Sequence, residues 1–131
     1  MTLAIGKNYR VAPDVVWRLI TDTRCWPLWG PSVRAVDCDD VFIQRGSRGR
    51  VLTPLGIGLP FVVDAFEPKT FWGWRVAGIP ATGHRVDPIT PHGCRLTFSV
   101  PAWAVAYLPV CYLALVRIQR LLSQLDQKDR R

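Results

Sequence analysis

The sequence predicts an α+β domain in which an antiparallel sheet packs against one long C-terminal helix. Seven runs with strand-like alternation or β-branched and aromatic composition are separated by Gly, Pro and Asp. A run of helical periodicity follows the last of them. Strands grouped together and closed by a segregated helix indicate an antiparallel α+β fold. At 131 residues, the chain is expected to form one domain over residues 1–131.

The first strand is expected from Leu3 to Val11, where alternate residues are apolar. Pro13 suits the first position of a helix, and Asp14 suits its first turn. A second short helix should begin near Thr23, carry two tryptophans and end by Gly30. The remaining six strands are expected at Val33–Cys38, Arg48–Thr53, Gly58–Phe66, Phe71–Val76, Gly83–Pro88 and Cys94–Val100. The segment from Gly78 to Gly83 is interpreted as rich in turns.

The long helix should bury a stripe of residues spaced three and four apart, namely Leu108, Cys111, Leu115, Ile118, Leu122 and Leu125. Its N-terminal half is apolar on every side, so we expect protein, ligand, partner or lipid to cover it. Pro109 predicts a kink or a new helix start, because proline donates no backbone hydrogen bond. The uncharged run from Leu96 to Val116 has only about 15 helical residues after Pro101, against roughly 20 for a membrane span.

The formal net charge of +7 favours anionic partners: an acidic ligand, a phospholipid surface or nucleic acid. The most basic segment, Arg45 to Arg50, has two glycines and is interpreted as an exposed hairpin connection. Only Phe42 lies near these arginines, which argues against a single-strand nucleic-acid reader.

Neither a metal site nor a disulfide framework is expected. Cys25, Cys38, Cys94 and Cys111 contain no C-x-x-C pair, and the two histidines complete no zinc spacing. The N-terminus has no basic region followed by a sustained apolar core, so a cytoplasmic protein with reduced thiols is expected.

Several short motifs occur in a characteristic order. They are Ala12-Pro13-x-x-Val16-Trp17 running into Asp22, Trp26-Pro27-x-Trp29 with Pro31-x-Val33, Phe66-x-Pro68 followed by Trp74, and Gly83-His84. Together they resemble the START/polyketide-cyclase (SRPBCC) superfamily over nearly the whole chain. The resemblance implies a helix-grip fold, in which a curved sheet of about seven strands wraps around the long helix and two short helices follow the first strand. It also implies an apolar cavity, but members include lipid carriers and polyketide cyclases, so it specifies no activity.

Two tryptophans, Trp72 and Trp74, share one face of their strand, whereas Phe71, Gly73 and Arg75 share the other. Aromatic side chains of this size either fill a core or form the wall of a ligand cavity, and one residue can do both. The expected ligand-binding residues are Trp29, Phe61, Trp72, Trp74, Phe98, Trp103 and Tyr107, with His84 and Arg75 as polar anchors. Arg75 is the weaker anchor because a regular strand points it away from Trp74.

Two further residues have alternative interpretations. His84 is either structural or a general acid or base acting on a bound carbonyl. Asp64 stands in an apolar strand, where we expect a solvent-facing ion pair with Arg75 across strands.

The function expected is binding or transport of an apolar or amphipathic, lipid-like or polyketide-like molecule, without a cofactor. One alternative is a polyketide cyclase or dehydratase, which would need two convergent titratable groups in the cavity. Another is an interaction module whose apolar helix half docks on a protein or an anionic membrane, which would make the protein peripheral to that membrane.

Overall fold

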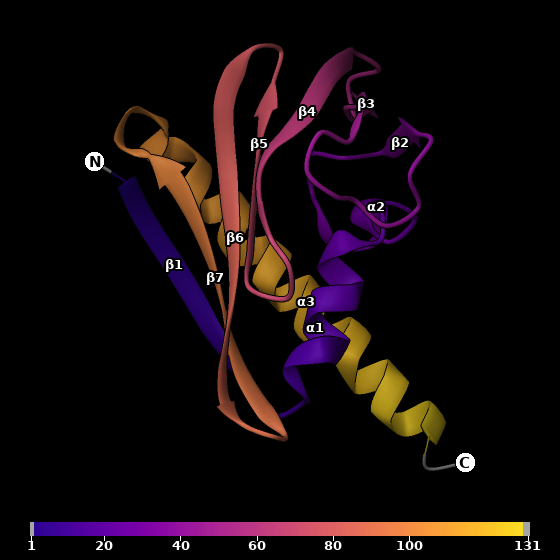
Figure 1. Ribbon diagram of the computed structural model, residues 1–131, viewed down its shortest axis with the longest axis vertical. Coiled ribbons are helices and arrows are strands. Elements are labelled where there is room, and N and C mark those ends of the chain that lie inside the picture. Colours follow the sequence, from indigo (N-terminus) through magenta and orange to yellow (C-terminus); the bar gives the residue numbers. More distant parts are fainter. Residues whose placement is uncertain (1, 130–131) are drawn as a thin grey trace.

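The computed structural model describes residues 2–129 and shows a seven-stranded antiparallel sheet with a long helix lying across one face (Figure 1). The strand order is β1-β7-β6-β5-β4-β3-β2, and every pairing is antiparallel. The expected fold class is therefore confirmed. The elements are β1 (Thr2–Tyr9), α1 (Pro13–Thr21), α2 (Trp26–Trp29), β2 (Ala35–Cys38), β3 (Arg48–Leu52), β4 (Gly58–Glu67), β5 (Phe71–Val76), β6 (Ile79–Thr90), β7 (Gly93–Pro101), η1 (Ala102–Tyr107) and α3 (Leu108–Asp129).

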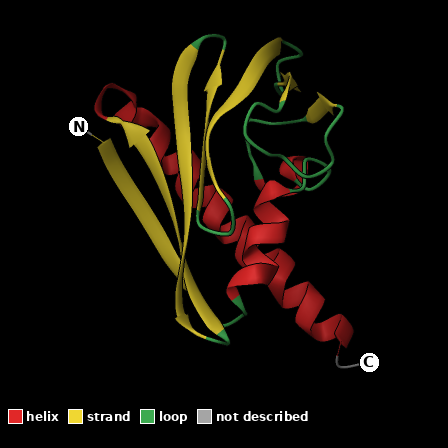
Figure 2. Cartoon of the chain, viewed as in Figure 1, coloured by secondary structure: helices red, strands yellow, loops and turns green. Residues whose placement is uncertain are grey.

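The two short helices follow β1 directly, as expected. Pro13 opens α1, and Val16, Leu19 and Ile20 form its buried face. The helix ends where Asp22 takes an extended conformation. The second helix is shorter than predicted, because residues 23–25 form a turn before Trp26. In Figure 2 these two helices and α3 lie on the same side of the sheet.

The helix α3 is the main partner of the sheet. Four members of the predicted stripe, Cys111, Leu115, Ile118 and Leu122, are buried, and so is Ala114. The Tyr9 hydroxyl, at the end of β1, donates a hydrogen bond to the Leu115 carbonyl at 2.6 Å. The prediction that Leu125 is buried is wrong: its side chain is 48% exposed, because the helix runs on past the edge of the sheet (Figure 1).

The apolar run before α3 is broken as Pro109 predicts. Residues of η1 form a 3-10 helix with non-helical angles at Ala104, and α3 starts afresh at Leu108, so Pro109 occupies its first turn. Within residues 2–129, the stretch Ala102–Leu125 is long and apolar enough to cross a membrane on length and composition alone. One such stretch is weak evidence of a membrane span; 28% of the apolar window is buried, and the buried part includes the stripe of α3 that packs on the sheet.

The interpretation of Gly78–Gly83 as turn-rich is wrong. Only Ala77 and Gly78 form the turn, with φ angles of 53° and 78°, and β6 begins at Ile79. Pro80 is tolerated inside β6 because β7 pairs with β6 only from Gly83 onward. This longer strand puts Thr82 on the same face as His84, which affects the site described next.

The strand predicted from Arg48 is confirmed, because β3 begins there and contains Arg48 and Arg50. The interpretation of the whole segment Arg45–Arg50 as a connection is therefore wrong: only its first part, with Gly46 at φ 87°, forms the turn before β3.

Candidate functional site: a two-part apolar cavity

An aromatic cluster connects α2 with the middle of the sheet. The ring of Trp26 in α2 stacks on Trp72 in β5, with centroids 5.3 Å apart and planes 5° apart. Trp74 meets Trp26 edge-on at 5.2 Å, and Trp29 lies 5.8 Å from Phe98 of β7. Aromatic pairs at these separations are favourable beyond the area they bury. The cluster therefore fixes α2 over the sheet.

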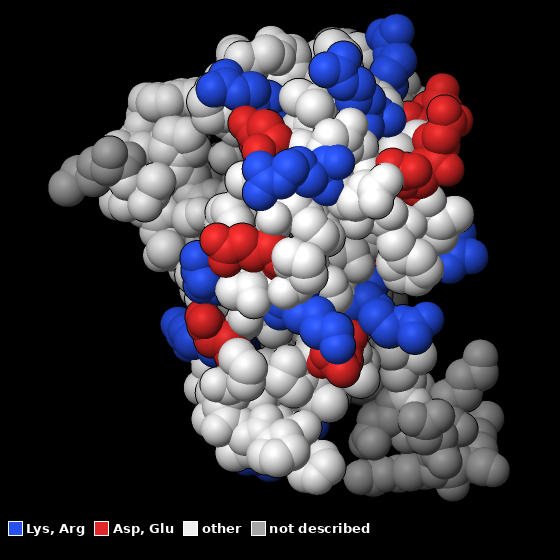
Figure 3. All heavy atoms as spheres, in the orientation of Figure 1, with Lys and Arg blue, Asp and Glu red and all other residues white. Residues whose placement is uncertain are grey.

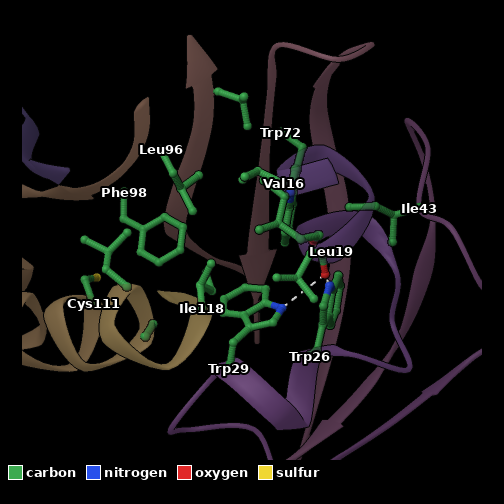
Figure 4. Packing of buried hydrophobic residues seen from close by; sticks show 14 of the residues in the cluster. Val16, Leu19, Trp26, Trp29, Ile43, Trp72, Leu96, Phe98, Cys111 and Ile118 are labelled. Atoms are coloured by element: carbon green, nitrogen blue, oxygen red, sulfur yellow. Dashed lines mark hydrogen bonds between the residues drawn. The ribbon is translucent and has the colours of Figure 1, made fainter. Parts of the chain in front are cut away.

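Indole hydrogen bonds orient both tryptophans of α2. Nε1 of Trp26 donates to the carbonyl of Ile20 at 2.9 Å, and Nε1 of Trp29 donates to the carbonyl of Leu19 at 3.3 Å. Figure 4 shows Trp26 and Trp29 below the end of α1 that carries Leu19. Because these carbonyls lie in the last turn of α1, they have no partner further along the helix. The two indole N–H groups thus supply hydrogen bonds to free carbonyls at the end of α1, and these bonds hold both rings in position.

A chain of hydrogen bonds runs from β5 to β6 beside the aromatic cluster. Trp74 Nε1 donates to Thr82 Oγ1 at 2.9 Å, Thr82 Oγ1 lies 3.1 Å from His84 Nε2, and His84 Nδ1 lies 3.1 Å from the Trp72 carbonyl oxygen. A carbonyl can only accept, so Nδ1 carries the proton of a neutral His84. Nε2 must then accept from the Thr82 hydroxyl. This chain of hydrogen bonds fixes the orientations of the Trp74, Thr82 and His84 side chains.

His84 is neutral in this environment. It is 2% exposed, and burial lowers its pKa to about 3 despite the opposing hydrogen bond to the Trp72 carbonyl. Its one accepting nitrogen already receives the Thr82 hydroxyl. A side chain with this pKa and no free lone pair is poorly suited to general acid or base catalysis at neutral pH.

Two adjoining cavities, which share five lining residues, lie beside this chain of hydrogen bonds, next to the η1–α3 segment. The inner one has a volume of about 40 Å³ and the outer one about 380 Å³. Both are lined by Ser32, Val33, Trp74, Thr82 and Tyr107. The Ser32 and Tyr107 hydroxyls are hydrogen-bonded at 2.5 Å. The outer volume is within the range of small-molecule sites, whereas the inner one holds only a few atoms.

The lining of both cavities is uncharged. No Asp, Glu, Lys or Arg of the described chain lines either one. Burial raises the pKa of the Cys111 thiol to about 11 and also raises the pKa of the Tyr107 phenol, which the Ser32 hydrogen bond partly opposes. With His84, these are the titratable side chains in the lining, and each is neutral near pH 7.

Most of the predicted site residues meet at these cavities. Trp29, Trp72, His84 and Phe98 line the inner cavity, Trp103 lines the outer one, and Trp74 and Tyr107 line both. Phe61 lines neither, because it is buried 5.5 Å from the rings of both Trp26 and Trp74. It is a core residue beneath the wall.

Arg75 is also outside the cavities. It points to the other face of the sheet, where Nε binds the Asp64 carboxylate at 3.1 Å with both side chains partly exposed. The predicted ion pair across strands is therefore confirmed, and Arg75 does not reach a ligand in either cavity.

Sequence reasoning missed Ser32 and Thr82. Thr82 stands two residues before His84, so strand alternation would have placed both on one face had β6 been extended to Ile79. Ser32 lies in the irregular segment after α2, where no periodicity indicates its direction.

Among residues 2–129, no group of three or more His, Cys, Asp or Glu side chains is placed to hold a metal ion. The four cysteines are free thiols.

Comparison with known proteins agrees with this architecture. The family model described as polyketide cyclase/dehydrase and lipid transport matches residues 8–125. No curated protein sequence is similar enough to count as a relative.

Solved structures share the fold at low sequence identity. Protein MLL2253 from Mesorhizobium loti has a TM-score of 0.75 and 16% identity, over 95% of this chain and 98% of that one. XoxI from Bacillus cereus has a TM-score of 0.73 and 14% identity, over 95% and 97%. DynU16, a protein in the dynemicin biosynthetic locus, has a TM-score of 0.67 and 22% identity, over 93% of this chain and 47% of that one.

Proposed function

Because the chain belongs to the polyketide cyclase/dehydrase and lipid transport family, we propose that it binds and carries an uncharged, apolar molecule in the two-part cavity. The observation that carries this proposal is the outer cavity of about 380 Å³, whose lining is apolar apart from a few neutral hydroxyls and backbone groups. A carboxylate or phosphate inside would lose its hydration without gaining a counter-charge. The buried part of the ligand is therefore neutral, and any charged group stays at the mouth.

The polar groups at the junction of the cavities give the ligand an orientation. Thr82 Oγ1 accepts one hydrogen bond from Trp74 and donates one to His84. Its second lone pair remains for a hydrogen-bond donor of the ligand. Ser32 and Tyr107 bond each other and can exchange that bond for one to a ligand hydroxyl or carbonyl. A lipid-like or polyketide-like body with one such group fits this arrangement.

Acid–base catalysis is supported less well than binding. A cyclase or dehydratase would need two convergent groups that change protonation near neutral pH. His84, Tyr107 and Cys111 all stay neutral there, because burial lowers the pKa of the first and raises those of the others. A carrier in the cytoplasm, in contact with a membrane but not with nucleic acid, is the function that we propose.

Native mass spectrometry of the protein purified from its own host would test this proposal. We expect a retained neutral ligand, seen as a defined mass increase. Ala104→Phe should reduce this retention by occupying part of the outer cavity, because Ala104 lines that cavity. The control is Ala106→Phe on the same 3-10 turn, where the side chain is exposed and lines neither cavity. Equal retention by both variants, or a ligand that carries its charge inside the cavity, would contradict the proposal.

A further inference from the structure

Five large apolar side chains are exposed at one end of the molecule. We call them the mouth rim: Leu55 and Ile57 in the β3–β4 connection, Ile79 at the start of β6, and Trp103 and Val105 in η1. Their exposed fractions run from 52% for Ile79 to 87% for Leu55. Single exposed apolar residues are ordinary, but five from three separate segments at one place indicate an interaction surface.

The mouth rim borders the opening of the outer cavity. Ile79 and Trp103 line that cavity directly. The β3–β4 connection that carries Leu55 and Ile57 is flanked by Thr53 and Leu59, which also line it. Figure 1 shows the connections after β3 and β5 reaching the same end of the molecule. A partner seated on the rim would therefore also cover the mouth.

The chain around the mouth is basic. The segments 30–36, 50–60, 74–82 and 98–116 contain three arginines, Arg34, Arg50 and Arg75, and no aspartate or glutamate. Asp37, just outside them, lies opposite Arg50 across β2 and β3 and offsets part of its charge. The Arg50 guanidinium binds the Gly58 carbonyl at 3.3 Å, next to Ile57, and that of Arg75 binds the Gly78 carbonyl at 3.2 Å, next to Ile79. Asp64 offsets part of the Arg75 charge. In Figure 3 Lys and Arg side chains gather at this end of the face, with Asp and Glu side chains beside them.

We infer that the mouth rim docks on an anionic phospholipid surface, with the cavity mouth facing the bilayer. Apolar tips flanked by arginines match a membrane whose headgroups are acidic and whose interior is apolar. The indole of Trp103 suits the boundary between the two. Docking depends only on this surface, whereas its purpose, passage of a neutral molecule between bilayer and cavity without crossing water, rests on the proposed function.

Vesicle flotation would test the docking. The probes are phosphatidylcholine vesicles and vesicles of phosphatidylcholine and phosphatidylglycerol in equal parts, each at low and at high salt. We expect binding to the anionic vesicles that weakens steeply as salt rises, because exposed charges are screened. Equal binding to both compositions at low salt would overturn the inference, and so would no binding to either.

Matched variants locate the surface. Ile57→Ser should weaken binding to anionic vesicles about five- to tenfold, because an apolar side chain no longer inserts. Ile89→Ser is its control, since Ile89 is 57% exposed against 55% for Ile57 but lies near the β6–β7 turn at the other end of β6. Equal losses in the two variants would contradict docking through the rim.

A second pair of variants distinguishes the arginines beside the mouth rim from the net charge of the protein. Arg34→Gln with Arg50→Gln should weaken anionic binding about fivefold for each arginine. Arg10→Gln with Arg120→Gln removes the same charge away from the rim and should have a smaller effect. Equal effects would show attraction by net charge alone and would refute a localised surface.

One added measurement distinguishes the two proposals. A neutral fluorescent lipid analogue, presented in solution without vesicles, reports the cavity alone. Retained binding of this probe with no vesicle binding would refute docking and leave the proposed function intact. Vesicle binding in a protein that fails to bind the probe would refute the cavity function and support docking. Thermal unfolding of every variant checks that these surface changes leave the fold unaltered.

Discussion

His84 lies almost flat on Trp72, with ring centroids 3.8 Å apart and planes 16° apart, and it donates its Nδ1 proton to the carbonyl of the same residue. One residue of β5 thus holds both the face and the edge of the imidazole. A ring held in this way, with Thr82 at its other nitrogen, has a fixed tautomer and a fixed orientation. The neutral imidazole therefore links β6 to β5 through one stacking contact and one hydrogen bond.

Acid should destabilise the protein through His84. The pKa of His84 is about 3 in the folded protein against an ordinary 6.5, so between these pH values the imidazole is protonated in the unfolded chain and neutral in the folded one. This contribution to stability is complete above about pH 6.5 and is lost as pH falls toward 3. The free energy of unfolding should fall by up to about 1.4 kcal/mol per pH unit below pH 6. Urea unfolding between pH 7 and pH 5 would measure it.

Two histidine variants test whether His84 causes this pH dependence of the free energy of unfolding. His84→Gln should flatten it, because no titrating group remains at the buried position. His92→Gln should leave it unchanged, because His92 is exposed near the β6–β7 turn. An unaltered slope in His84→Gln would show that the buried imidazole does not account for the acid sensitivity.

Trp74→Ala should weaken ligand binding more than it destabilises the fold. A fully buried Trp typically costs about 3 to 5 kcal/mol when truncated. Trp74 is only partly buried and borders both cavities, so we expect a loss below about 3 kcal/mol together with a large loss of affinity for a neutral lipid analogue. Chemical unfolding and calorimetric titration would measure the two effects.

The comparison variant for Trp74 is Phe61→Ala, which removes a buried ring outside both cavities. It should lower stability and leave affinity per folded molecule nearly unchanged. If Trp74→Ala behaves in the same way, Trp74 is a core residue and not part of the wall.

Tyr107→Phe should reveal which ligands use the junction. Removing the hydroxyl frees Ser32 and takes away one hydrogen-bonding group, which is worth roughly 0.5 to 1.5 kcal/mol. Affinity for an alcohol or ketone probe should fall about three- to tenfold, while affinity for a hydrocarbon of the same length should stay constant. Tyr112→Phe is the control, since Tyr112 is 59% exposed and lines neither cavity. Equal losses for both probes would argue against polar recognition at Tyr107.

Tyr9→Phe tests the attachment of α3 to the edge of the sheet. The change removes a buried donor from the Leu115 carbonyl, and we expect a loss of about 1 to 2 kcal/mol in the free energy of unfolding. Denaturant titration gives the value directly. A loss below about 0.3 kcal/mol would show that the apolar stripe alone holds the helix.

Sequence patterns predicted the features that depend on local periodicity. Pro13 marked the start of α1, and the spacing of Cys111, Leu115 and Ile118 gave the buried face of α3, because one side of a helix faces the core. Prediction failed where burial depends on which element lies opposite the helix and not on the spacing of residues along it. Leu125 continues the stripe, but no sheet lies opposite it.

The site was less predictable than the fold for a related reason. Pro80 is typical of a turn, yet it lies in β6, where it pairs with Arg75 of β5 on one side only. The other neighbour, β7, pairs with β6 only from Gly83 onward, and no local sequence window shows where that distant strand begins to pair. Without the longer β6, the relation between Thr82 and His84 was not visible. The alternation that put Trp74 inward did correctly indicate that Arg75 points outward.

The cluster of Trp26, Trp72 and Trp74 also has an optical consequence. Their ring centroids lie between 5.2 and 5.6 Å apart, close enough for the electronic transitions of the indoles to couple. Such coupling produces paired bands of opposite sign in circular dichroism, and their intensity depends on the mutual angles of the rings. Trp74 borders the cavities, so a bound molecule that tilts it alters those bands. The protein thus carries a built-in spectroscopic reporter of its own occupancy, without any attached dye.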